Sequence, residues 1–91
     1  MTVDMRLPGG DLVAQGIADL EQGVESIPSL LVSIGYRRLQ RLGLDIPPGR
    51  DMPERRLYEL LADEAPATAH SRYNAWLRRL ISFEHAGECA G

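Results

Sequence analysis

Residues 68–85, TAHSRYNAWLRRLISFEH, have the clearest amphipathic pattern in the chain. Apolar residues recur there every three or four positions, which places them on one face of a helix: Ala69, Tyr73, Trp76, Leu77, Leu80 and Phe83. The polar residues fall on the opposite face: Ser71, Arg78, Ser82 and His85. The pattern therefore predicts a helix from about Thr68 to His85, with Ala86-Gly87 closing it.

Glycine and proline divide the preceding residues into shorter helical segments. An apolar stripe predicts a helix over residues 11–23, and Ser26 is expected to cap a second helix that is apolar on most sides. Gly35 should break that helix, because continuing it would bring an arginine into the apolar stripe. A short helix over 36–42 then follows, and after a Pro-Pro-Gly loop a further helix is expected over 53–63.

The fold class predicted from these segments is all-α, a small irregular or orthogonal bundle of four to five helices. Residues 1–91 are expected to form a single helical domain, with 1–10 as a flexible lead and 87–91 as a frayed tail. Trp76 is expected near the centre of the core. Gly16 and Gly23 lie seven residues apart beside the stripe of the first helix, where glycines let another helix approach closely. The alternative for Gly23 is that it simply caps the end of that helix.

Composition excludes several classes of protein. The chain has 91 residues, 44% of them hydrophobic and 25% charged, which is typical of a globular domain. Cys89 is the only cysteine, so no internal disulfide forms, and no cysteine and histidine set has zinc-ligand spacing. No cofactor, membrane span or signal peptide is indicated, and a cytoplasmic protein of bacterial type is expected.

Charge is distributed unevenly along the chain, although the net charge is only −3. Residues 1–35 hold five acidic side chains against one arginine, whereas residues 36–56 hold six arginines against three acidic side chains. The acidic and basic segments could pair within the chain or across a homodimer. The negative net charge disfavours general binding of nucleic acid.

Arg37, Arg38 and Arg41 form the sharpest charge cluster, on the outer face of the short helix over 36–42. Guanidinium groups make forked contacts with phosphates and carboxylates, so this cluster is a candidate contact for phosphate or for an acidic partner. The alternative is a solvated helix face that pairs with the acidic first segment.

Two further patterns suggest nucleic-acid chemistry. Residues 54–83 can be read as a helix-turn-helix, whose second helix would present polar side chains to the bases: His70, Ser71, Arg72 and Asn74. Arg78 or Arg79 followed by His85 resembles the arginine and histidine motif of HEPN-type ribonucleases. That resemblance implies a histidine acting as acid or base, an arginine holding phosphate, and a site built across a dimer. A simpler role for Arg78 and His85 is to complement the helix dipole.

The leading functional prediction is a non-catalytic helical interaction or accessory module that associates with itself or with another protein. A chain this short buries a thin core, and the apolar faces of its helices are wide for a monomer. The alternatives are a nucleic-acid-binding regulator that uses the arginine-rich face, and a HEPN-like ribonuclease or the partner of one.

Overall fold

The fold is built around one short helix that is mostly buried. The computed structural model describes residues 3–90, and within that range it contains helices and no strand. The elements in chain order are α1 (Gly10–Glu21), α2 (Ile27–Ile34), α3 (Tyr36–Arg41), α4 (Pro53–Glu64), a single 3-10 turn (Pro66–Thr68) and α5 (Ala69–Ala90). The all-α bundle predicted from the sequence is therefore confirmed.

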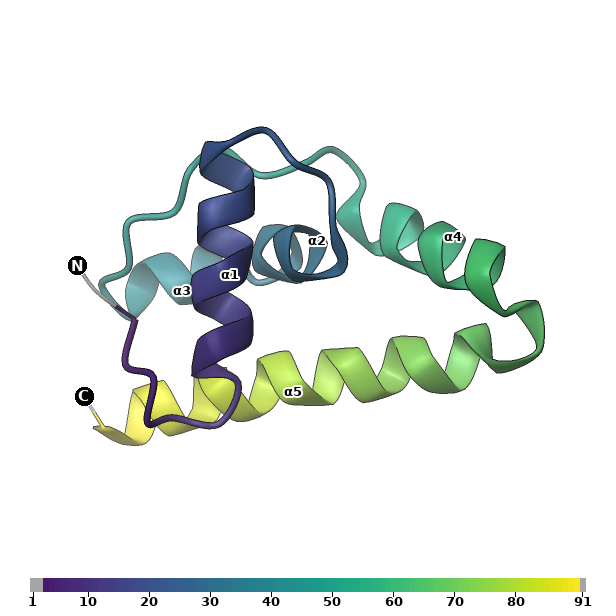
Figure 1. Ribbon diagram of the computed structural model, residues 1–91. Helices are drawn as coiled ribbons and strands as arrows, with labels where there is room; N and C mark the ends of the chain where they lie inside the picture. Colours follow the sequence, from purple (N-terminus) through teal and green to yellow (C-terminus); the bar gives the residue numbers. More distant parts are fainter. Residues whose placement is uncertain (1–2, 91) are drawn as a thin grey trace.

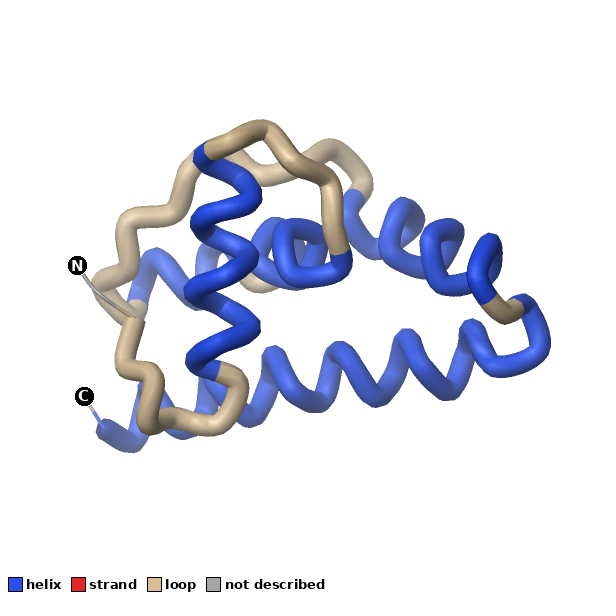
Figure 2. Tube along the Cα trace, in the orientation of Figure 1, coloured by secondary structure: helices blue, strands red, loops and turns tan. Residues whose placement is uncertain are grey.

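Helix α2 lies at the centre, and α1, α3, α4 and α5 all contact it. Figure 1 shows α1 crossing in front of α2, with its first turn over α5, while α4 and α5 fold back on each other as a hairpin. The tube in Figure 2 shows how long loops join these helices on one side of the bundle. Because neighbouring helices cross steeply, the bundle is orthogonal rather than a parallel stack.

Local sequence explains where α2 begins and ends. The Ser26 side chain accepts a hydrogen bond from the backbone N–H of Ser29 at 3.1 Å, and the Ser29 hydroxyl accepts one from the N–H of Ser26 at 2.8 Å. This reciprocal capping box satisfies two N–H groups that the helix leaves unpaired. Gly35 ends α2 and begins α3, as the sequence predicts.

The buried apolar side chains gather around α2. Leu30, Leu31 and Val32 are almost completely enclosed, together with leucines from α3 and α4. The prediction that Trp76 lies near the centre is wrong, because its side chain is only partly buried and packs at the edge of this cluster. Helix α2 covers only part of the apolar face of α5, so Trp76 lies at the edge of the core.

Both chain ends differ from their predicted behaviour. Helix α5 continues to Ala90, so residues 87–90 are helical rather than a frayed tail. Gly87 accounts for this, because a Cβ there would lie 2.8 Å from the Leu42 side chain, and the close contact holds the last turns of α5 against the end of α3. At the other end, Val3 is buried in the core, so most of the predicted flexible lead is folded. Residues 1, 2 and 91 lie outside the described range.

Close packing of α1 against α2 depends on Gly16. A Cβ at this position would collide with the backbone oxygen of Pro28 and a methyl group of Val32. The backbone oxygen cannot move without displacing the first turn of α2. The close approach predicted at Gly16 is therefore confirmed. At Gly23 a Cβ would meet no atom within 4 Å, so the close approach predicted there is wrong and Gly23 only follows the end of α1.

We expect Gly16→Ala to lower the free energy of unfolding by about 2 kcal/mol, since overpacking a close helix contact outweighs the gain in helix propensity. Urea unfolding monitored by circular dichroism measures this change in the free energy of unfolding. The control is Gln15→Ala, an exposed neighbour that should change stability by less than about 0.5 kcal/mol. A Gly16→Ala variant stabilised by about 1 kcal/mol, as helix propensity alone requires, would contradict the close contact.

Candidate functional site

A groove with a volume of about 640 Å³ lies between the α2–α3 junction and α5. Its apolar walls come from Ile34 on α2, Pro53 at the start of α4, and Leu77, Leu80 and Ile81 on α5. Three arginines also line the groove: Arg37 and Arg38 on α3, and Arg50 on the loop before α4. The groove thus combines apolar surface with positive charge, within the size range of ligand-binding pockets.

Glu84 contributes a buried carboxylate to the groove. Only 3% of its side chain is exposed, and its Oε1 accepts a hydrogen bond from Nη1 of Arg38 at 3.3 Å. A Cβ at position 35 would lie 2.7 Å from Oε2 of Glu84, so Gly35 leaves the space that the carboxylate fills. A buried carboxylate needs a cationic partner, and Arg38 supplies that charge from the rim.

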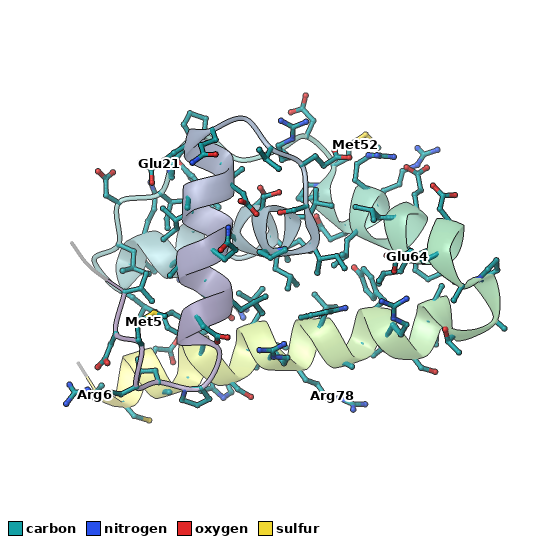
Figure 3. All side chains as sticks on the ribbon, viewed as in Figure 1. Met5, Arg6, Glu21, Met52, Glu64 and Arg78 are labelled. Atoms are coloured by element: carbon teal, nitrogen blue, oxygen red, sulfur yellow. The ribbon has the colours of Figure 1, made fainter. Side chains whose placement is uncertain are left out.

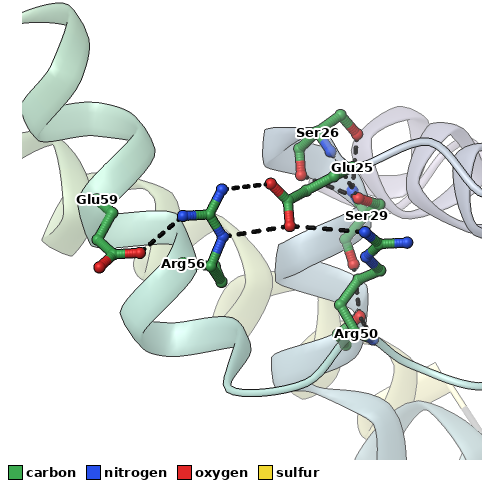
Figure 4. A network of polar contacts seen from close by, with 7 residues as sticks. Glu25, Ser26, Ser29, Arg50, Arg56 and Glu59 are labelled. Carbon is green, nitrogen blue, oxygen red and sulfur yellow. Dashed lines mark hydrogen bonds and ion pairs between the residues drawn. The ribbon is translucent and has the colours of Figure 1, made fainter.

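A second polar network holds the loop that carries Arg50 (Figure 4). The carboxylate of Glu25 accepts a hydrogen bond from Nη2 of Arg56 at 2.6 Å and lies 3.7 Å from Nη2 of Arg50. The hydrogen bond from Arg56 lowers the pKa of Glu25. The backbone N–H of Arg50 also donates to the Ser33 hydroxyl at 2.9 Å. One wall of the groove is thereby fastened to α2 and α4.

This network also resolves part of the charge asymmetry in the sequence. Glu25 belongs to the acidic first segment, and both Arg50 and Arg56 belong to the basic middle segment. They pair within the chain, and Asp11 and Arg79 approach each other to 3.9 Å as well. Some of the charged side chains that could pair either within the chain or across a homodimer therefore pair within the chain.

The structure divides the predicted arginine cluster. Arg37, Arg38 and Arg41 are all exposed on α3, but only Arg37 and Arg38 line the groove. Arg41 lies in a second hollow with Leu42, Gly87 and Glu88, and Arg38 lines both this hollow and the groove. Arg37 and Arg41 make no ion pair with any residue in the range 3–90, whereas Arg38 pairs with Glu84.

The residues of the ribonuclease-like pattern do not line this groove. The guanidinium of Arg79 lies 5.1 Å from the centre of the Trp76 ring, a cation–π contact on another face of α5. Arg78 points away from the bundle in Figure 3, and His85 is exposed. Of the helix-turn-helix residues, Arg72 pairs with Glu64 at 2.9 Å, and the Asn74 amide lies 3.4 Å from Nε2 of His70.

Other kinds of site find no support in the described part of the chain. Residues 3–90 contain no cluster of three or more His, Cys, Asp or Glu side chains suited to a metal ion. None of the helices described is long and apolar enough to cross a membrane. The Ser33 hydroxyl in the groove donates to the carbonyl of Ser29 at 2.8 Å and accepts from Arg50, so it is occupied by backbone groups.

Sequence reasoning missed Gly35 and Glu84 as site residues. Gly35 was predicted only as a break between helices, and its contact with Glu84 joins segments almost fifty residues apart. A signal for Glu84 does exist, because it lies four residues after Leu80 and seven after Leu77. That spacing puts a carboxylate on the same side of the helix as two core leucines.

Comparison with protein-family models, curated proteins and solved structures finds no match to this chain.

We expect Arg38→Ala to lower the free energy of unfolding by about 1–3 kcal/mol, because Glu84 would then be a buried carboxylate without a cation. The matched control is Arg37→Ala, the neighbouring exposed arginine, which should change stability by less than about 0.5 kcal/mol. Chemical denaturation measures both variants. Equal losses in the two would contradict a structural role for the pair between Arg38 and Glu84, as would no loss in either.

Proposed function

We propose that this protein is a small, non-catalytic helical interaction module that receives a helical segment of another protein chain, which can be a second copy of itself. One observation carries the proposal: the groove between the α2–α3 junction and α5 exposes apolar side chains to solvent. Ile81 is 41% exposed at its edge, beside the partly buried Leu77. An open groove of this kind is where an amphipathic helix docks in known recognition modes.

The chemistry of the groove supports binding rather than catalysis. The residues that line it include neither histidine nor cysteine. Its buried acid, Glu84, is neutralised by Arg38, and its buried hydroxyl, Ser33, is engaged by the backbone. The arginines at the rim would orient a partner by charge, while the apolar walls would supply most of the binding energy.

A second candidate function is binding of nucleic acid through the arginines of α3. The observation in its favour is that Arg37 and Arg41 are exposed and have no acidic partner within residues 3–90. The net charge of −3 opposes it. Binding of this kind would weaken steeply with salt, because each arginine that contacts a phosphate releases a counterion.

Size-exclusion chromatography with light scattering tests the proposal on natively purified protein, with absorbance recorded at two wavelengths that separate protein from nucleic acid. We expect a protein complex larger than one chain, without excess nucleic-acid absorbance. Ile81→Asp should reduce it to the monomer, because a charge at the groove would lose its hydration on docking.

Ser82→Asp is the matched control, since Ser82 is the next residue and lies on the outer face of α5. It should leave the complex intact. A complex that survives Ile81→Asp would contradict docking in the groove. Co-elution with nucleic acid would instead favour the second candidate.

A further inference from the structure

The two sides of the groove differ in their charge. Helix α5 contributes three apolar side chains and one acid, which is buried: Leu77, Leu80, Ile81 and Glu84. The side across from α5 carries all three arginines of the groove, two of them on α3 and one on the loop before α4. Basic charge in the groove is therefore confined to the side across from α5.

Two of these arginines have hydrogen-bond donors left for a partner. Arg37 is exposed and makes no ion pair with any residue among 3–90. The side chain of Arg38 is 63% exposed, and it donates to Glu84 through Nη1. A guanidinium carries several N–H donors in a fork, so Arg38 can bind a second carboxylate while it keeps the first. Arg50 is less available, because Glu25 lies 3.7 Å from its Nη2.

Acidic side chains do not balance this charge within the groove. Glu84 is the one acid among the residues that line it, and only 3% of its side chain is exposed. Asp51 and Glu54 are exposed and follow Arg50 closely in the sequence, but neither of them lines the groove. The net charge of the whole chain is −3. A negatively charged partner is thus attracted to the basic side of the groove, while the net charge disfavours its binding elsewhere.

The apolar side of the groove matches about two turns of a partner helix. Leu77 and Glu84 are the first and last residues of α5 that line the groove, and seven positions separate them, about 10 Å along the axis. Leu77 and Ile81 are four residues apart, so they follow one side of α5. A partner helix that packs here places its own apolar stripe against α5. The residues beside that stripe then lie next to the arginines.

We propose that the groove binds an amphipathic helix of another protein, in which aspartate or glutamate residues flank the apolar stripe and pair with Arg37 and Arg38. This inference rests on the proposed interaction function and names the chemistry of the partner. A second copy of this chain fits less well. Its helix α1 has three acids and no basic residue, but the large apolar side chains of α1 that are buried lie against its own core: Leu12, Val13 and Leu20. Apolar contact would supply most of the affinity, and the ion pairs would select an acidic helix.

Selection from a library of displayed helical peptides tests the chemistry of the partner. The peptides vary in the apolar residues of one stripe, and the positions beside the stripe are glutamate, glutamine or lysine. We expect the wild-type protein to select glutamate there, and Arg37→Glu to select lysine instead. Fluorescence anisotropy then measures the dissociation constant of a selected glutamate peptide, which should rise about tenfold for Arg37→Glu because like charges replace an ion pair.

The matched control is Arg78→Glu, which makes the same change in net charge at a side chain that points away from the bundle (Figure 3). It should still select glutamate and leave the dissociation constant unchanged, and thermal unfolding monitors whether each variant folds. Equal effects of the two changes would overturn the inference, and so would selected peptides that carry glutamine or lysine as often as glutamate. If Ile81→Asp abolishes the binding of such peptides, the acidic partner is wrong while the proposed interaction function stands. If no selected peptide depends on Ile81, both fail.

Discussion

The whole structure depends on enclosing α2, an eight-residue helix that is apolar on almost every side. Such a helix cannot face water, so other helices must cover it from every direction. Helix α1 can come close enough only because Gly16 has no side chain, and α3 can turn away immediately because Gly35 separates it from α2. The serine side chains of this segment bond to its own backbone: Ser26 and Ser29 accept from each other's N–H groups, and Ser33 donates to the carbonyl of Ser29.

The groove follows from a mismatch in helix length. Helix α5 has 22 residues and α2 has eight, so α5 spans about 33 Å while α2 spans about 12 Å. Helix α4 packs along the beginning of α5, and the end of α3 contacts Gly87 near its last turns. Between them, the stretch from Leu77 to Glu84 lies beside the open α2–α3 junction. Glu84 occupies the floor there and requires Arg38, so the architecture that buries α2 also fixes a cation at the rim.

Local signals in the sequence predicted the helices well, because those signals act over a few residues. The cap at Ser26, the break at Gly35 and the amphipathic pattern after Pro66 each predicted an element that the structure contains. The central role given to Trp76 was wrong, since residue size does not reveal how much surface the neighbouring helices cover. The candidate site was predicted in part. Arg37 and Arg38 line the groove, but Glu84 reaches Arg38 through a contact that no local pattern encodes.

The central claim is that the groove between the α2–α3 junction and α5 receives a helical segment of a partner chain. An environment-sensitive fluorophore attached at Ile81→Cys, in a Cys89→Ser background, measures this directly, because residue 81 is 41% exposed at the edge of the groove. The account predicts that the emission shifts to shorter wavelength when the complex forms, because docking removes water from the groove. A complex whose formation leaves the emission unchanged would contradict it.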